Sequence, residues 1–432
     1  MDAVFAPTNT VACMLAYESA WAQATAECGL IPAAAAARIA EICASANFDL
    51  SALAKATRLA GNPVIPFLAA LTAAVAARDP VAANYVHWGA TSQDVLDTAL
   101  MLQVRAALAL LEAESRLLRN VLSALCAQHA HTPLIARTLL QHAEPTTFGL
   151  KIAGWLSGLN GARAQLRQAQ QQALAIQFGG ASGTLSALGK HGLTVNADLA
   201  ARLELPMPDL PWHAHRQRIV EIGAAMALLL GTLGKLARDL SLMTQSEVAE
   251  VQEPWQPGRG ASSAMPQKRN PVSCAVVLAA ATRAPGLLTT LLAGMAQEHE
   301  RGLGGWHAEW ETLPELCRLS AGALAHLREV CSGLQVNTAQ MQRNLAQAQG
   351  QAVAATLALA LTPLLGGMRA HALVTELCTA STTQQQNLRT IAGADATVRS
   401  ALNDCELDEI FTVAHDFGMN DALIARALRD PG

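Results

Sequence analysis

The sequence predicts an all-α protein, and three observations support this fold class. Apolar residues recur at three- and four-residue spacing along most of the 432-residue chain. Alternating strand patterns are nearly absent. Hydrophobic residues make up 51% of the chain and aromatic residues only 4%, so small aliphatic side chains must fill the core, which favours close-packed helices. A chain of this length exceeds one hydrophobic core, and we expect three helical domains.

The first predicted domain covers residues 1–110. Helical spacing runs over residues 11–77 and is interrupted at 29–32 and 61–63, where glycine and proline occur. A glycine-containing turn, HWGATSQD, follows at residues 87–94. This domain is therefore predicted to contain several short helices that end at a polar turn.

The second predicted domain covers residues 111–350 and has a long central five-helix bundle. Its apolar stripes can be buried only if the long helices pack on one another. The five periodic stretches are 94–130, 146–174, 216–245, 273–296 and 313–330 or beyond. Residues 252–270, rich in Gly, Pro and Ser, are predicted to form a loop, and such a loop on a rigid bundle is a candidate functional site. Residues 351–432 are predicted to form a smaller helical domain.

Composition and charge exclude several classes of function. Only 15% of residues are charged, so parts of the helix surfaces are expected to be buried in subunit contacts of an oligomer. The net charge of −4 and the lack of a basic stripe argue against nucleic acid as a partner. The uncharged stretches 222–234 and 352–367 fall short of a membrane-spanning length, so no membrane is expected. The N-terminal residues do not form a signal peptide, which predicts a cytoplasmic protein.

The nine cysteines are scattered singly, which predicts reduced thiols and neither disulfides nor a zinc knuckle. Two pairs of histidines, at 129 and 131 and at 213 and 215, have no carboxylate or cysteine at a spacing that would complete a metal site. No phosphate-binding loop or dinucleotide fingerprint is present. We therefore expect no metal and no cofactor.

The segment GRGASSAMPQKRNP, at residues 258–271, is the most unusual in the chain. It offers hydroxyl groups, backbone N–H groups and a lysine, and it precedes a helix whose N-terminus would favour a bound carboxylate. The alternative is a surface linker made of loop-forming residues.

Three further groups of residues could either bind a ligand or have only a structural role. In HWGATSQD, His87, Thr91 and Ser92 could bind an anion, although Ser92 or Asp94 could equally cap a helix. In RTLLQHAEPTTFGLK, Gln141 and His142 precede a helix start predicted at 145–147, but a lone histidine is usually structural.

Arg301 lies in EHERGLGGWHAEW, at residues 298–310. A guanidinium group can clamp a carboxylate with two parallel hydrogen bonds. Alternatively, Arg301 simply pairs with Glu298 or Glu300.

Taken in order, these segments resemble the three signature regions of the fumarase/aspartase superfamily over nearly the whole chain. SSAMPQKRNP resembles the loop G-S-S-x-M-P-x-K-x-N-P of that family, with Ala261 in place of its leading glycine. The resemblance implies that Ser262 is the base that removes a proton from carbon. It also implies that Lys268 and Asn270 bind substrate.

Two other segments of the chain resemble the first and second signature regions of the superfamily. HWGATSQD resembles the first region, which implies that Thr91 and Ser92 hold a substrate carboxylate near His87. RTLLQHAEPTTFG resembles the second region, R-T-H-x-Q, whose threonine and glutamine match Thr138 and Gln141.

Leu139 stands where the lyases of the superfamily place a general-acid histidine. An acid helps to expel an amine or hydroxide, whereas the opening of a lactone expels a carboxylate that is already a stable anion. Leu139 therefore favours a lactone-forming member. The segments 177–185, 211–221 and 297–310 also resemble the bacterial carboxymuconate cycloisomerases more than the adenylosuccinate lyases.

The resemblance implies a cycloisomerase that interconverts 3-carboxy-cis,cis-muconate, a small anionic polycarboxylate, and its lactone. Ser262 would transfer the proton, with Lys268 and loop N–H groups favouring its alkoxide. Arg301 would help to bind substrate, and His142 is a candidate second proton carrier. The resemblance also implies a homotetramer with a twenty-helix core and composite active sites.

Three alternatives remain open at this point. The first is a 3-sulfomuconate cycloisomerase, and the second is a fumarate-releasing lyase of the adenylosuccinate type. The third, a non-catalytic helical binding protein, would be expected to lose the serine loop, whose Ser262, Lys268 and Asn270 are retained.

Overall fold

The computed structural model of the chain describes residues 1–412 and 417–429. The predicted all-α fold is confirmed, because helices account for most of the described residues. The first helices are α1 (Pro7–Glu27), α2 (Ala33–Ser45), α3 (Leu50–Ala60), α4 (Val64–Ala76) and the 3-10 turn η1 (Ala82–Tyr85). Both predicted interruptions are present, and a third precedes Asp49, whose carboxylate caps α3 by accepting from the N–H groups of Ser51 and Ala52.

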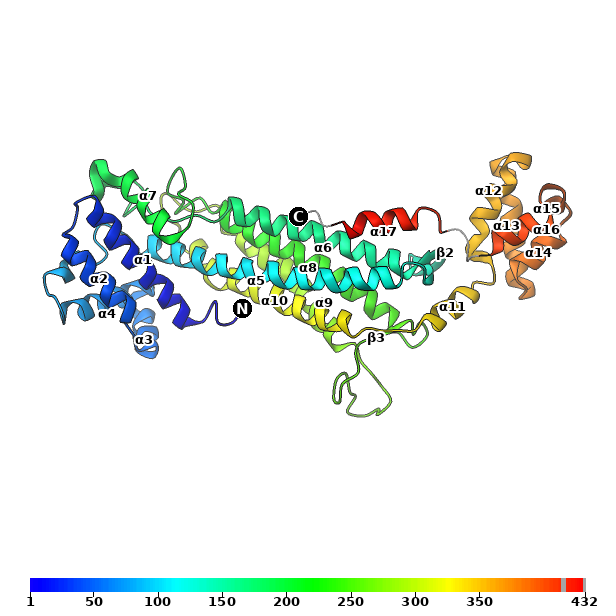
Figure 1. The fold of residues 1–432 in the computed structure, drawn as a ribbon, viewed down its shortest axis with the longest axis horizontal. Helices are drawn as coiled ribbons and strands as arrows, with labels where there is room; N and C mark the ends of the chain where they lie inside the picture. Colours follow the sequence, from blue (N-terminus) through cyan, green and yellow to red (C-terminus); the bar gives the residue numbers. More distant parts are fainter. Residues whose placement is uncertain (413–416, 430–432) are drawn as a thin grey trace. The chain divides into compact units, whose positions relative to one another are not determined.

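The structure contains five long helices, as predicted (Figure 1). Most of their ends lie within a few residues of those expected from the apolar spacing, but α10 begins earlier than predicted. The five helices are α5 (Ser92–Gln128), α6 (Phe148–Gln172), α8 (Gln217–Met243), α9 (Val272–Ala293) and α10 (Gly305–Ser332).

A β-hairpin between α5 and α6 corrects the prediction of a helix start at 145–147. Strands β1 (Pro133–Thr138) and β2 (Gln141–Thr147) pair antiparallel, and α6 begins only at Phe148. The hairpin buries Leu134 and Ile135 while β2 is mostly polar, so neither strand shows the alternation that reveals a strand in sequence. A second, smaller pairing joins β3 (Val251–Gln252) to β4 (Gln335–Val336).

The chain divides into two compact units, and each long helix contributes residues to both. Unit 1 comprises residues 1–115, 162–231 and 279–324, and unit 2 comprises 116–161, 232–278 and 325–432. The three-domain division at residues 110 and 350 stays a prediction, and residues 413–416 and 430–432 of its last domain lie outside the described part.

The remaining helices are short. Unit 1 contains η2 (Ser186–His191) and α7 (Gly192–Leu203). In unit 2, a separate apolar cluster that includes Leu357, Leu361, Leu388 and Leu407 holds several of the C-terminal helices together. The helices of unit 2 after β4 are α11 (Thr338–Ala346), η3 (Gln351–Val353), α12 (Ala354–Leu365), α13 (Gly367–Gln384), α14 (Leu388–Ala394), α15 (Ala396–Ala401), α16 (Asp404–Phe411) and α17 (Asn420–Leu428).

Within unit 1, a buried arginine joins three of the long helices. Arg216, just before α8, binds Asp97 of α5 (Nη1 to Oδ2, 2.8 Å) and Glu309 of α10 (Nη2 to Oε2, 2.5 Å). Close packing of α8 continues at Gly223, where a Cβ atom would lie only 2.4 Å from Cδ1 of Leu291 on α9. Apolar contact and a satisfied ion network therefore position the helices of this unit.

Within unit 2, polar contacts fix the hairpin near its tip and join two of the long helices. Trp155 Nε1 of α6 donates to Asp239 of α8 at 2.7 Å. Arg137 of β1 binds Glu250, which is buried, through two hydrogen bonds of 3.0 and 2.7 Å. The pair of Arg137 with Glu250 anchors β1 to the segment that leads into the serine-containing loop.

Helices α8 and α9 are long and apolar enough to cross a membrane, judged by length and composition alone. The uncharged stretch 222–234 lies within the 27-residue α8, so the expectation that it is too short to span was wrong for the helix as a whole. In the most apolar part of α8, 61% of the residues are buried within the structure, against only 22% for α9. Much of the apolar surface of α9 is therefore exposed.

Candidate active site

The turn at residues 87–91 leads into the N-terminus of α5. Asp94, rather than Ser92, caps this end, because its Oδ2 atom accepts a hydrogen bond of 3.0 Å from the backbone N–H of Thr91. Thr91 and Ser92 are half-buried, so their hydroxyl groups remain within reach of a solute. The positive end of the helix dipole lies at the same place, which favours an anion there.

Arg301 and Thr91, both predicted site residues, are brought together in unit 1. The Arg301 Nη1 atom donates to Thr91 Oγ1 at 2.9 Å, and Nη2 donates to the carbonyl of Ala181 at 3.1 Å. The buried Nε atom of Arg301 has no hydrogen-bond partner in the described part of the chain. Glu298 instead accepts from the backbone N–H of Leu303 at 2.8 Å, so the alternative pairing of Arg301 with Glu298 does not form.

His87 lies in the same turn and is paired with a buried carboxylate. Its Nδ1 atom is 2.7 Å from Oε1 of Glu18, a residue of α1 that is 1% exposed. Burial lowers the pKa of His87, but the charge and hydrogen bond of Glu18, with a further contribution from Asp94, outweigh burial and raise it. The raised pKa favours the protonated form of His87, whose charge is paired with Glu18, in a turn that already contains Thr91, Ser92 and a helix N-terminus.

The hairpin of unit 2 places the second group of predicted residues at its tip. Thr138 and Gln141 are directly opposite each other in the strand register, and His142 is opposite Arg137. Partial burial, then the charge of Arg137, lowers the pKa of His142, with Glu250 opposing the shift. Between the strands, Leu139 points a side chain that is 97% exposed into solvent.

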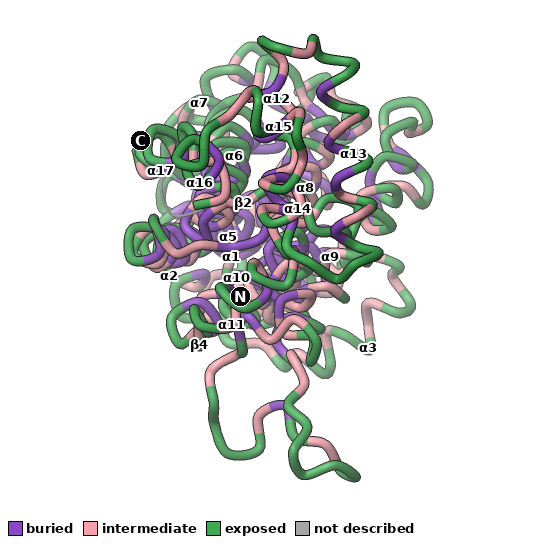
Figure 2. Tube along the Cα trace, turned by 90° about the vertical axis from the view of Figure 1, so that its right-hand side faces the viewer, coloured by how far each residue is buried: buried purple, intermediate pink, exposed green. Residues whose placement is uncertain are grey.

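The loop that follows β3 carries the third group, and its predicted non-helical character is confirmed. Figure 2 shows this segment as largely exposed. Gly260 closes the loop, since its carbonyl accepts from the backbone N–H of Asn270 at 2.9 Å and from its side-chain amide at 3.1 Å. A Cβ atom on Gly260 would lie 2.4 Å from the Asn270 carbonyl oxygen, so this crossing requires glycine.

The hydroxyl oxygen of Ser262 accepts hydrogen bonds from two backbone N–H groups of the same loop. Met265 donates at 3.1 Å and Ala264 at 3.4 Å. Lys268 is exposed, and its backbone N–H binds the carbonyl of Met265. The loop thus turns its N–H groups toward the one oxygen that the resemblance assigns as a base.

An arginine ties the base of the loop to the N-terminus of α9. Arg259 donates to Ser273 Oγ at 2.7 Å and forms ion pairs with Glu253 and Glu329. Glu253 in turn accepts from the backbone N–H of Cys274 at 2.9 Å. Ser262, Lys268 and Asn270 are therefore presented by a loop whose two ends are fixed on unit 2.

Two buried residues of unit 1 were missed in the sequence. Glu18 gave only the signal of an acid within an otherwise apolar helix. His213 was considered solely as a metal ligand, whereas its Nε2 atom lies 2.7 Å from Oδ1 of Asp94. Among the described residues, no three His, Cys, Asp or Glu side chains gather in a way that could hold a metal ion.

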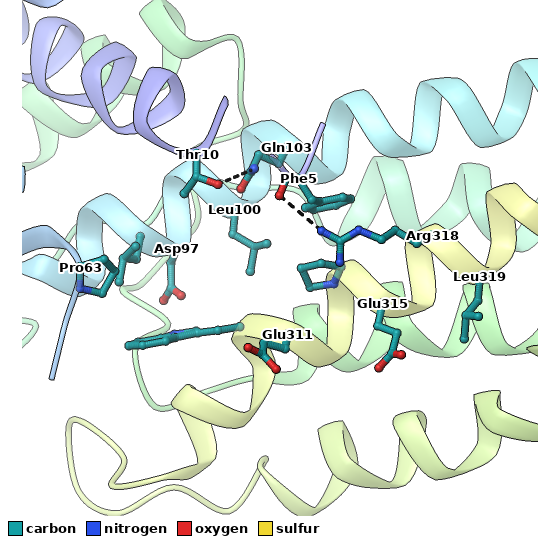
Figure 3. A pocket seen from close by; sticks show the side chains of 13 residues that line it. Phe5, Thr10, Pro63, Asp97, Leu100, Gln103, Glu311, Glu315, Arg318 and Leu319 are labelled. Atoms are coloured by element: carbon teal, nitrogen blue, oxygen red, sulfur yellow. Dashed lines mark hydrogen bonds between the residues drawn. The ribbon is translucent and has the colours of Figure 1, made fainter. Parts of the chain in front are cut away.

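A cavity of about 640 Å³ in unit 1 is separate from the predicted site residues (Figure 3). Arg318 on its wall donates to the carbonyl of Phe5 at 3.3 Å, and Gln103 donates to Thr10 at 3.1 Å. None of the residues assigned to the site from the sequence lines it. The cavity lining is Phe5, Thr10, Pro63, Leu96, Asp97, Leu100, Gln103, Trp310, Glu311, Pro314, Glu315, Arg318 and Leu319.

Comparison with known proteins places the chain among relatives that match it along its whole length. It is 49% identical to a 3-carboxy-cis,cis-muconate cycloisomerase of Pseudomonas aeruginosa, over 100% of this chain and 94% of the relative. It is 41% identical to a nitrosuccinate lyase of Streptomyces davaonensis, over 100% of this chain and 92% of the relative.

A solved structure of an enzyme of the same kind is also similar to this chain. The 3-carboxy-cis,cis-muconate lactonizing enzyme from Pseudomonas putida superposes with a TM-score of 0.90 at 45% identity, covering 97% of this chain and 93% of that one. The family model described as lyase matches residues 6–286. The chain therefore belongs to this lyase family, within the fumarase/aspartase superfamily that its three signature regions resemble.

Proposed function

We propose that the chain is a cycloisomerase that interconverts 3-carboxy-cis,cis-muconate and 4-carboxymuconolactone. The observation that carries the proposal is Leu139, an apolar residue at the hairpin tip where lyases of the superfamily place an acid. The acid is absent at this position, but the serine loop is retained. A serine base with no acid at position 139 suits a reaction whose leaving group is a stable carboxylate. Full-length relatives named as cycloisomerases support the same assignment.

The proton is transferred by Ser262 in this proposal. In the lactonizing direction, a substrate carboxylate adds to the diene and forms a C–O bond, and the resulting aci-carboxylate is protonated at carbon. In reverse, the Ser262 alkoxide removes the proton α to a carboxylate, and the C–O bond breaks. An unperturbed hydroxyl is too weak a base, and the N–H groups of Ala264 and Met265 on its oxygen favour the alkoxide.

Positive charge and hydrogen-bond donors hold the substrate and its doubly charged intermediate. His87, Thr91, Ser92 and Arg301 bind one carboxylate at the N-terminus of α5. The other substrate contacts come from Thr138, Gln141, Lys268 and Asn270. His142 is the second proton carrier, a role that suits a histidine whose lowered pKa leaves its ring neutral near pH 7.

The active unit is a homotetramer whose twenty-helix core contains five long helices from each subunit. The exposed apolar surface of α9 supports this assembly, because exposed apolar patches of this kind mark protein–protein contacts. The signature regions of different subunits form each composite active site. The enzyme uses neither a metal nor an organic cofactor, and it acts in the cytoplasm in protocatechuate degradation by the β-ketoadipate route.

A second candidate is a lyase that expels a stable anion. The relative named nitrosuccinate lyase, 41% identical, favours it, because loss of nitrite from nitrosuccinate would also need no acid at position 139. A fumarate-releasing lyase of the adenylosuccinate type is less well supported, since its nitrogen leaving group benefits from an acid. The serine loop argues against a purely structural helical protein.

Product analysis by proton NMR separates these candidates. Purified protein is incubated in turn with 3-carboxy-cis,cis-muconate, 3-sulfomuconate, nitrosuccinate and adenylosuccinate. The proposal predicts that 3-carboxy-cis,cis-muconate is converted into the lactone at the highest kcat/KM. Faster turnover of 3-sulfomuconate would show that this compound is the preferred substrate. Rapid fumarate release with no lactone would show that the protein is a lyase and not a cycloisomerase.

A further inference from the structure

A single buried carboxylate connects the three segments that surround the proposed anion site. Asp94 is 0% exposed and accepts four hydrogen bonds. Its Oδ1 atom accepts from the backbone N–H of Gly179 at 3.0 Å and faces Nε2 of His213 at 2.7 Å. Its Oδ2 atom accepts from the N–H of Thr91 at 3.0 Å and of Gly180 at 3.1 Å. Both oxygens are therefore fully used, and none of these bonds involves solvent.

The segments that Asp94 joins also meet by close backbone approach. Gly180 has a φ of 71°, and a Cβ atom there would lie 3.2 Å from the carbonyl oxygen of Gly89 in the turn. A Cβ atom on Gly179 would lie 2.7 Å from Cβ of Pro211. Packing this tight leaves the turn and the glycine loop a single relative position, which the carboxylate then fixes.

Arg301 depends on the same junction for its position. Its guanidinium group binds Thr91 Oγ1 from the turn and the carbonyls of Gly180 (3.4 Å) and Ala181 (3.1 Å) from the glycine loop. The donor assigned to a substrate carboxylate is thus held by two segments that Asp94 joins.

We propose that Asp94 and His213 form a buried positioning pair that holds Thr91 and Arg301 in the geometry needed to bind a substrate carboxylate. The inference rests on the proposed function, since it assigns one substrate carboxylate to this site. Asp94 acts through its neighbours and does not touch the substrate. His213 donates its Nε2 proton to Asp94, which orients the carboxylate and offsets the cost of burying its charge.

The hydrogen bonds of Asp94 predict the effect of each substitution. Asp94→Asn places an amide NH₂ group against two donors in either orientation, because each oxygen of Asp94 already accepts two bonds. His213→Leu removes one donor, whereas His213→Gln keeps an N–H that can reach Asp94. Thr98→Val is the matched control, because Thr98 lies about one turn further along α5 and binds the carbonyl of Gln177 at 3.0 Å without touching the turn.

The test measures anion binding separately from turnover. Calorimetry gives the dissociation constant of tricarballylate, a saturated tricarboxylate that cannot react, and kinetics with 3-carboxy-cis,cis-muconate give kcat and KM. Asp94→Asn and His213→Leu are expected to raise both the dissociation constant and KM about tenfold or more, with kcat within about threefold of wild type, because binding of an unreacting carboxylate is lost equally in ground and transition states. His213→Gln should recover most of this loss.

Thr98→Val should lower the unfolding temperature but leave the dissociation constant and KM unchanged. The inference is overturned if Asp94→Asn and His213→Leu lower only the unfolding temperature, or if Thr98→Val weakens binding as much as they do. It is also overturned if the wild type does not bind tricarballylate. Binding without turnover of the muconate would refute the proposed function alone, and if Asp94→Asn fails to fold, the two His213 variants decide.

Discussion

Two consecutive leucines at the hairpin tip adopt a backbone conformation that leucine disfavours. Leu139 and Leu140 have φ values of 50° and 67°, and their side chains are 97% and 76% exposed. Two-residue hairpin turns of this kind are usually built from Asn-Gly or Asp-Gly. Because no such residues are present, the turn could not be recognised in the sequence, and the hairpin was missed.

Replacing these leucines should stabilise the protein. Leu139→Asn combined with Leu140→Gly relieves a left-handed conformation that costs roughly 1–2 kcal/mol per residue, so the urea midpoint should rise. Leu59→Asn, at a leucine of α3 that is 95% exposed, is the control and should not stabilise. A lower midpoint for the double variant would show instead that the leucines pack against another surface.

The ion pair of His87 with Glu18 predicts a pH dependence of stability. The raised pKa of His87 means that the folded state holds a proton which the unfolded state releases near the usual value of 6.5. The stabilisation is fully present below that value and is lost as pH rises through the folded-state pKa. Urea unfolding from pH 6 to 9 should therefore show a fall in free energy of unfolding that Glu18→Gln reduces. Equal slopes in the two proteins would contradict this assignment.

At the scale of elements, helices were predictable and strands were not. The five long helices repeat apolar residues over more than twenty positions each, a signal that no short strand can match. Of the site, the serine loop and the turn before α5 could be located by motif. The hydrogen bonds that hold these segments together could not be predicted, because Asp94 contacts Gly179 and His213, which are far from it in the sequence. The same holds for Arg216, whose burial between two carboxylates no local pattern reveals.

Breaking the Arg216 network should be strongly destabilising. Arg216→Met leaves the carboxylates of Asp97 and Glu309 buried without their cationic partner, and the loss of one member of such a network typically costs about 3–5 kcal/mol. Arg202→Met removes the partially exposed pair with Asp198 in α7 and should cost only about 0.3–0.5 kcal/mol. Urea unfolding of both variants checks the difference, and similar losses would contradict the role of Arg216.

At the scale of the whole molecule, the low content of charged residues and the apolar surface of α9 both favour an oligomer. Val276 and Leu292 on α9 are 48% and 50% exposed. The oligomer expected from composition stays a prediction, since it depends on contacts between copies of the chain.

Light scattering tests this assembly. Wild type should have about four times the 45.2 kDa mass of one chain. Val276→Lys should dissociate it, because a lysine in an apolar interface is left without a partner. Leu59→Lys, on an exposed position of α3, should leave the mass unchanged. A monomeric wild type would contradict the tetramer.

The loss of the diene absorbance of 3-carboxy-cis,cis-muconate tests the central claim most directly. Wild type, Ser262→Ala and Ser263→Ala, which alters the neighbouring exposed serine of the same loop, are compared after treatment with chelator. The account predicts rapid loss of the diene band with wild type and with Ser263→Ala, and a loss slowed by a factor of about 1,000 or more with Ser262→Ala, because no other group in the loop replaces the base. A wild type that leaves the diene unchanged, or a Ser262→Ala variant as fast as wild type, would contradict it.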